Sequence, residues 1–114
     1  RDGLMLIIPT RSDLSSYRFQ VTIENVIYIF EFRWNTQFEF WTFDIYDFGS
    51  VPLITGVKLI INYPLTNRYA KEELPPGELI AIDSTSTLDR VGRYDLGDKV
   101  QLIYVTQAEN DAII

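Results

Sequence analysis

The sequence predicts an all-β protein, a small antiparallel β-barrel or sandwich with about six to eight strands and little helix. Three observations support this prediction. Several segments alternate apolar and polar residues with a period of two, which is typical of strands that bury one face. Turn-forming residues separate these segments. Almost no segment shows the periodicity of an amphipathic helix.

The first half of the chain contains the clearest strand patterns. Residues 4–8 form a short apolar run that Pro9 ends. Residues 17–23 alternate strictly between apolar and polar side chains, and the dipeptide Glu24-Asn25 then predicts a tight hairpin into residues 26–34. We therefore expect the second and third of these runs to pair as antiparallel neighbours.

The aromatic residues concentrate in the middle of this region. After a turn at residues 35–37, residues 38–46 alternate again, which predicts an antiparallel ribbon rich in Phe, Tyr and Trp. Turn residues at 47–50 end that ribbon, and a strand or two at 51–61 follows. Gly56 interrupts this last segment, where a bulge or turn fits.

The second half predicts two further strands, at residues 78–83 and 100–105. Residues 69–74 predict a single helical turn, which the following Pro-Pro-Gly ends. Residues 84–94 are polar and predict an exposed loop of a length that is often functional.

We expect the chain to form one β domain over residues 1–114. Two end segments, residues 1–10 and 106–114, are expected to act as interaction arms. Both contain apolar residues that the predicted core does not need.

Composition excludes several kinds of chemistry. The chain has no Cys and no His, which excludes disulfides, thiol nucleophiles, thiolate metal sites and imidazole bases. Its formal charge is −6, so we expect no nucleic-acid binding, which depends on clustered Lys and Arg. Its apolar runs are far shorter than the roughly 20 residues of a membrane-spanning helix, so we expect no membrane contact. We expect no enzyme activity, no cofactor and no metal.

Three alternatives place chemistry on particular residues. The carboxylates Glu39, Asp44 and Asp47 lie close in sequence to aromatic residues, as in glycoside hydrolases. The oxygen-rich segment from Asp83 to Asp89 offers ligands of the kind that calcium prefers. For both sets, hydrogen bonds within turns and between strands provide a structural interpretation, which we favour.

The third alternative is a small carbohydrate-binding module. Trp34 and Trp41 are its candidate stacking residues, if an exposed and roughly coplanar pair is available. Because alternation places most aromatic side chains on the inward face, core packing is the favoured interpretation of these residues too.

Several segments in a fixed order resemble the phage baseplate plug family of contractile-tailed phages, including cyanophages. The matching segments are residues 17–23, 33–35, 43–47, 53–57, 74–79, 93–97 and 100–105, together with Asp83. The resemblance implies a non-enzymatic structural virion protein, a plug or hub-associated subunit near the lower end of the tail tube.

The resemblance also implies the partners. These are other baseplate proteins (hub, tube initiator and spike), with several copies of the chain following the ring symmetry. The protein would be made in the host cytoplasm and reside in the tail baseplate of the virion. We expect contacts through both arms and the loop at 84–94, with these candidate residues: Leu4, Leu6, Ile8, Asp89, Arg90, Arg93, Ile113 and Ile114.

Overall fold

A computed structural model describes residues 5–66 and 73–106 of the chain. These residues form seven strands and no helix. The strands are β1 (Met5–Ile8), β2 (Ser16–Ile23), β3 (Val26–Asn35), β4 (Phe40–Asp47), β5 (Pro52–Lys58), β6 (Glu78–Asp83) and β7 (Val100–Val105). The all-β prediction is therefore confirmed, although most of the helical turn expected at residues 69–74 lies outside the described residues.

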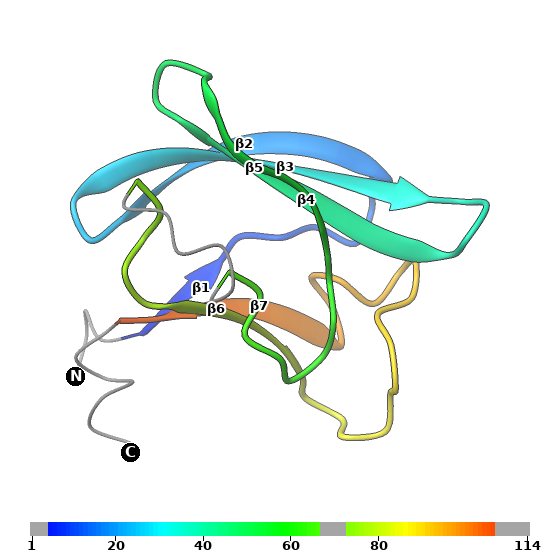
Figure 1. Cartoon of the computed structure of the whole chain (residues 1–114). Helices are drawn as coiled ribbons and strands as arrows, with labels where there is room; N and C mark the ends of the chain where they lie inside the picture. The colour runs from blue at the N-terminus through cyan, green and yellow to red at the C-terminus, as the bar shows by residue number, and fades with distance from the viewer. Residues whose placement is uncertain (1–4, 67–72, 107–114) are drawn as a thin grey trace.

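The strands form two separate antiparallel sheets, which Figure 1 shows as two layers packed against each other. One sheet has four strands in the order β2-β3-β4-β5, and the other has three in the order β1-β7-β6. No strand pairing joins the sheets into a closed cylinder within the described residues. The fold is thus a sandwich, one of the two architectures that the sequence left open.

Turn chemistry fixes the register of the four-stranded sheet. Glu24 and Asn25 have positive φ angles of 51° and 70°, which is the backbone conformation of a two-residue hairpin turn with the favoured twist. Their turn pairs Ile23 with Val26 and sets the whole β2–β3 register. The β3–β4 turn is longer than predicted, because it extends to Glu39, and Phe38 is left exposed on it.

A bulge bends β5 where the sequence predicted an interruption. Gly56 has a φ of +68°, a conformation that side-chain-bearing residues rarely adopt, and the β4–β5 register shifts beside it. The bulge turns the Gly56 N–H toward the Asp44 carboxylate, to which it donates a hydrogen bond of 2.8 Å. The glycine therefore serves both the bend and the environment of Asp44.

The core lies between the inner faces of the two sheets. Stacked aromatic rings line the inner face of the four-stranded sheet, and neighbouring ring centroids lie 5.3 to 6.2 Å apart. This aromatic cluster comprises Tyr17, Phe19, Phe30, Phe32 and Phe43. Leu79, Leu102 and Tyr104 of the three-stranded sheet are also fully or almost fully buried in the core. Core packing is therefore the main use of the aromatic content.

Candidate interaction surfaces

Asp44 is a buried structural carboxylate with partners on both oxygens. Its side chain lies on the outer face of β4, yet the residue is only 1% exposed. One oxygen accepts the Gly56 N–H, and the other accepts hydrogen bonds from Arg33 at 2.5 Å and from the Tyr46 hydroxyl at 3.2 Å. This hydrogen bond with Asp44 also raises the pKa of the Arg33 guanidinium. Asp44 therefore ties three strands together.

The other two carboxylates of the hydrolase alternative lie away from Asp44. Asp47 accepts a hydrogen bond of 2.9 Å from the Val51 N–H and so closes the β4–β5 turn. Glu39 lies at the opposite end of β4, where it makes an exposed ion pair of 3.4 Å with Arg90. The structure brings no two of these three carboxylates into one cleft, so it provides no geometry for glycoside hydrolysis.

The two tryptophans form an edge-to-face pair. Trp41 is fully buried, and its indole N–H donates a hydrogen bond of 3.0 Å to the Gly92 carbonyl. The Trp34 ring is inclined by 62° to the Trp41 ring. A sugar-stacking platform needs exposed and nearly coplanar rings, and this pair is neither. The geometry does not support the carbohydrate-binding alternative.

The Asp83 carboxylate organises the start of the loop at residues 84–94. One oxygen accepts the N–H and the hydroxyl of Thr85, and the other accepts the N–H groups of Thr87 and Leu88. These hydrogen bonds, above all the one from the Thr85 hydroxyl, lower the pKa of Asp83 to about 2. The described residues contain no group of three acidic, His or Cys side chains placed to hold a metal ion.

The three predicted contact residues of this loop, Asp89, Arg90 and Arg93, have different environments. Asp89 and Arg90 are exposed, and the ion pair between Arg90 and Glu39 brings the loop to the end of the sandwich where the β3–β4 turn lies. Figure 1 shows this turn on the right. Arg93 is half-buried because its guanidinium packs 4.6 Å from the centre of the Tyr94 ring and donates a hydrogen bond to the Ser12 carbonyl. Asp89 and Arg90 are therefore available to a neighbour, whereas Arg93 also ties the loop to the connection between β1 and β2.

The N-terminal candidates alternate along β1. Ile8 is fully buried in the core and Leu6 is half-buried against it, whereas Ile7 between them is 61% exposed. Ile7 is thus an outward-facing apolar residue of this strand, which the sequence did not single out. Leu4, Ile113 and Ile114 lie outside the described residues.

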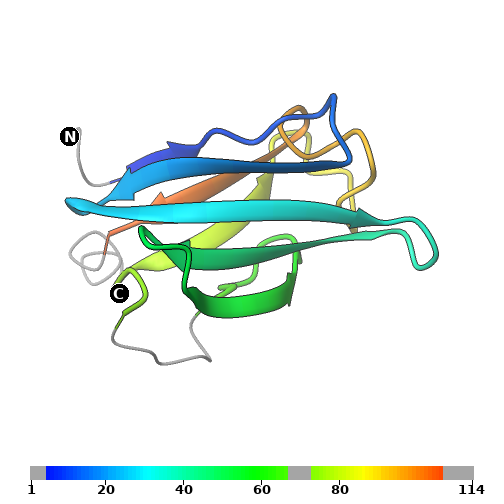
Figure 2. The same ribbon diagram turned by 90° about the horizontal axis from the view of Figure 1, so that it is seen from above.

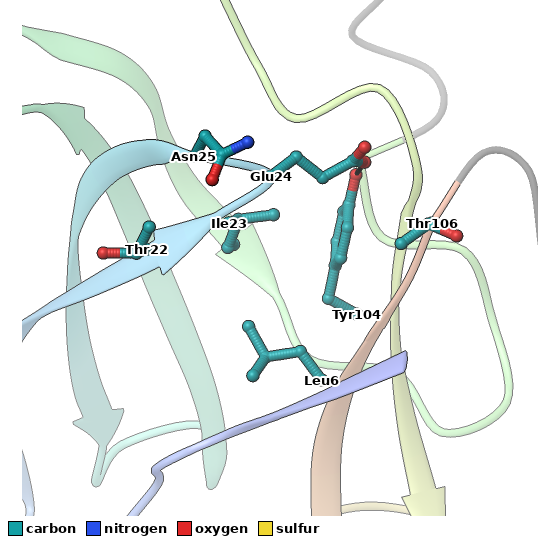
Figure 3. A pocket seen from close by; sticks show the side chains of 7 residues that line it. All are labelled: Leu6, Thr22, Ile23, Glu24, Asn25, Tyr104 and Thr106. Atoms are coloured by element: carbon teal, nitrogen blue, oxygen red, sulfur yellow. Dashed lines mark hydrogen bonds between the residues drawn. The ribbon is translucent and has the colours of Figure 1, made fainter. Parts of the chain in front are cut away.

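A pocket of about 540 Å³ opens at the end of the sandwich where the β2–β3 turn lies. Figure 3 shows Leu6 of β1 and Ile23 of β2 on its apolar side, with the Tyr104 ring between the two sheets. Thr22, Asn25 and Thr106 complete the lining together with Glu24. Seven residues thus supply one carboxylate and no basic group, a setting that suits a partner side chain with an apolar stem and a basic tip.

Tyr104 fixes the back of this pocket. Its hydroxyl donates a hydrogen bond to the Glu24 carboxylate and accepts one of 2.6 Å from the Gly77 N–H. Burial, together with the hydrogen bond to Glu24, raises the pKa of the Tyr104 hydroxyl well above its usual value. A Cβ atom at Gly77 would lie 2.0 Å from the Val105 carbonyl oxygen, so only glycine allows this approach.

Sequence reasoning missed this pocket because its lining comes from segments far apart in the chain: β1, the end of β2 with the β2–β3 turn, and β7 with Thr106 after it. The dipeptide Glu24-Asn25 gave a signal for the turn, but nothing in the sequence indicates that Glu24 meets Tyr104, 80 residues further along the chain.

The described residues form no helix of the length and apolarity needed to cross a membrane.

Comparison with curated proteins finds no match. A protein-family model described as cyanophage baseplate Pam3 plug gp18 matches residues 5–108, which include all seven strands. This match confirms the resemblance drawn from the sequence, and a baseplate plug is a structural component of the phage tail. The chain therefore belongs to the cyanophage baseplate plug family.

Proposed function

We propose that this protein is a hub-associated structural subunit near the lower end of the tail tube and that it has no enzymatic activity. The family match over residues 5–108 carries this proposal. The structural roles of Asp44, Asp47 and Asp83 support the second part, because hydrogen bonds within the fold engage each of these carboxylates.

We further propose that residues 1–114 act as one domain with contact arms at residues 1–10 and 106–114. The strands from β1 to β7 support a single domain, since both sheets contribute to one shared core. The third proposed contact is the loop at 84–94, where Asp89 and Arg90 are exposed. Leu4, Ile113 and Ile114 remain proposed contacts of the arms.

The partners in this proposal are the hub, tube-initiator and spike proteins. Several copies of the chain would follow the ring symmetry through head-to-tail contacts. A formal charge of −6 supports the absence of nucleic-acid binding, because an acidic surface repels DNA that passes through the tail. The chain would be made in the host cytoplasm and reside in the tail baseplate of the virion, with no membrane partner.

Charge reversal in the loop tests this proposal. Baseplates are purified from phage that carry Arg90→Glu or the matched control Lys58→Glu, and mass spectrometry measures how much of the chain each contains. Both side chains are exposed, but Lys58 lies on β5, outside the three proposed contact segments. We expect Arg90→Glu to lower incorporation severalfold and Lys58→Glu to leave it unchanged.

Two results would contradict the proposal. Equal incorporation of both variants would remove the loop from the contacts. Recovery of intact baseplates without the wild-type chain would overturn the function itself. Cross-linking of purified baseplates then identifies which of the hub, tube-initiator and spike proteins the chain touches.

A further inference from the structure

The four edge strands of the sandwich differ in how they are protected. Strand edges present unpaired N–H and C=O groups, and proteins commonly shorten, bulge or cover them. β5 starts at Pro52 and bulges at Gly56, and β1 has only four residues before Pro9. β6 is covered, because the Asn62 and Leu65 N–H groups donate hydrogen bonds to its carbonyls.

β2 has none of these protections. It runs regularly for eight residues, with no proline, glycine or bulge, and pairs only with β3 within the described residues. Figure 2 shows its full length along one border of the four-stranded sheet. β2 is therefore the long open edge of the described fold.

The register identifies which backbone groups of β2 face outward. Facing residues in antiparallel strands alternate between pairs that exchange hydrogen bonds and pairs that do not. The tight turn makes Ile23–Val26 a bonded pair, so Val21 and Phe19 also bond to β3. The hydrogen bond of 2.8 Å from the Trp34 N–H to the Ser15 carbonyl continues the same alternation.

The N–H and C=O groups of Arg18, Gln20 and Thr22 consequently point away from β3. No hydrogen bond from these three N–H groups is present in the described parts of the chain. All three residues are exposed. The edge thus offers three consecutive donor and acceptor pairs at the spacing of an added strand.

Side chains on both faces of β2 indicate what would pair there. Tyr17, Phe19 and Val21 point inward but are only half-buried, because no further strand flanks them. An added strand with apolar residues at alternate positions would cover them. On the other face, the only charge is Arg18, whose side chain is 49% exposed and lies 3.7 Å from Glu31. A carboxylate on the added strand would complement it.

A second copy of this chain fits the edge less well. Residues 16–23 contain one basic and no acidic residue, so pairing β2 with β2 of another copy supplies no carboxylate to Arg18. Each copy also has a formal charge of −6, which opposes self-association. The charges therefore favour a different protein as the occupant.

We propose that β2 receives an extended segment of a neighbouring baseplate protein as an added strand, with alternating apolar and polar residues and a carboxylate beside Arg18. This inference rests on the proposed function, since it names the way in which the subunit holds one neighbour.

Amide hydrogen exchange at single-residue resolution tests the added strand. In the purified chain, we expect the N–H groups of Arg18, Gln20 and Thr22 to exchange rapidly, while those of Phe19 and Val21 are protected by β3. In purified baseplates, the three outward groups should slow by roughly tenfold or more. Rapid exchange of all three in baseplates that contain the chain would overturn the added strand and leave the proposed function intact.

Two other outcomes separate the remaining possibilities. Absence of the chain from purified baseplates would overturn the proposed function. Protection that develops when the purified chain alone is concentrated would assign the edge to a second copy, which contradicts a different protein as the occupant.

Substitutions in β2 test the added strand independently, because the amount of each variant chain in purified baseplates can be measured. Gln20→Pro removes one outward N–H without removing a hydrogen bond to β3, and Gln20→Ala is the matched control that keeps this N–H. We expect Gln20→Pro to lower incorporation by roughly tenfold or more, in line with the loss of a paired edge, and Gln20→Ala to match the wild type. Equal incorporation of both variants would contradict the added strand.

If Gln20→Pro does not fold, Arg18→Glu replaces it, with Lys58→Glu on the opposite edge strand as the control for charge. We expect only Arg18→Glu to lower incorporation. Unchanged incorporation of a folded Arg18→Glu chain would contradict a carboxylate beside this residue.

Discussion

The outer faces of the two sheets are chemically different. Across the four-stranded sheet, ion pairs link Arg18 to Glu31, Glu31 to Arg33 and Arg33 to Asp44. Across the three-stranded sheet, register instead aligns Ile7 of β1, Ile103 of β7 and Ile80 of β6 in one row. The same sandwich thus carries a charged ladder on one side and an isoleucine row on the other.

This difference shows that burial and polarity are separate properties here. Asp44 is charged yet buried on an outer face, whereas Ile7 is apolar yet 61% exposed. On the inner faces, by contrast, side chains such as Phe30, Phe32 and Leu102 are both apolar and fully buried. Stability should therefore depend most on the inner face, next on the buried carboxylate and least on the isoleucine row.

The largest loss of stability is expected from a substitution on the inner face of the four-stranded sheet. Phe32 is fully buried and stacks on Tyr17, Phe19, Phe30 and Phe43. Phe32→Ala should lower the free energy of unfolding by about 4 kcal/mol through lost burial and a cavity. Denaturant titration measures this change. The exposed Phe48→Ala is the control, expected within about 0.5 kcal/mol of the wild type.

Removal of the buried carboxylate should give the next largest effect. Asp44→Ala leaves the Gly56 N–H without its acceptor and removes one of the two carboxylates that pair with Arg33, so we expect a loss of about 3 kcal/mol. Asp13→Ala removes an exposed ion pair with Arg11, and we expect almost no change in the free energy of unfolding. Equal losses of stability for the two variants would mean that Asp44 contributes no more to the free energy of unfolding than an exposed ion pair does.

The pH dependence of the 84–94 loop should be smaller and confined to acid. Because the folded pKa of Asp83, about 2, lies below its ordinary value of 3.8, its ionised form stabilises the fold above that value. This contribution is lost as the pH falls from about 4 to about 2. Asp83→Asn lacks the contribution at every pH.

Unfolding titrations of the wild type and Asp83→Asn across this pH range measure the effect. The wild type should be the more stable chain at neutral pH, and the difference should shrink as the pH falls to 2. A difference that stays constant would mean that the Asp83 charge does not organise the loop.

The isoleucine row should give the smallest change in stability. Ile7→Thr alters an exposed side chain and should shift the free energy of unfolding by at most about 0.5 kcal/mol. The neighbouring Ile8→Thr places a hydroxyl in the core and should cost about 2 kcal/mol. Reversal of this order would mean that the two faces of β1 are exchanged.

Sequence patterns predicted the strands well because alternation and turn chemistry are local properties. The Glu24-Asn25 hairpin and the Gly56 bulge both appear in the structure where the sequence placed them. The sequence did not indicate which side chains of β1 face the core, because residues 4–8 are apolar throughout and lack any alternation. That is why Ile8 was expected at a contact surface and is instead found in the core.

The remaining features depend on pairings between distant residues. Asp44 meets Gly56 only because of a shifted register, and Glu24 meets Tyr104 only because the two sheets pack together. Likewise, the openness of the β2 edge follows from the strand order, which composition and periodicity do not specify. The pocket and the open edge could thus be found only in the folded chain.

Cryo-electron microscopy of the intact baseplate tests the central claim most directly, because it shows both the position of the chain and the state of its edges. We expect the chain within the baseplate, with a strand from another protein paired to Arg18, Gln20 and Thr22 of β2. A baseplate without the chain, or with the chain present and this edge open to solvent, would contradict that claim.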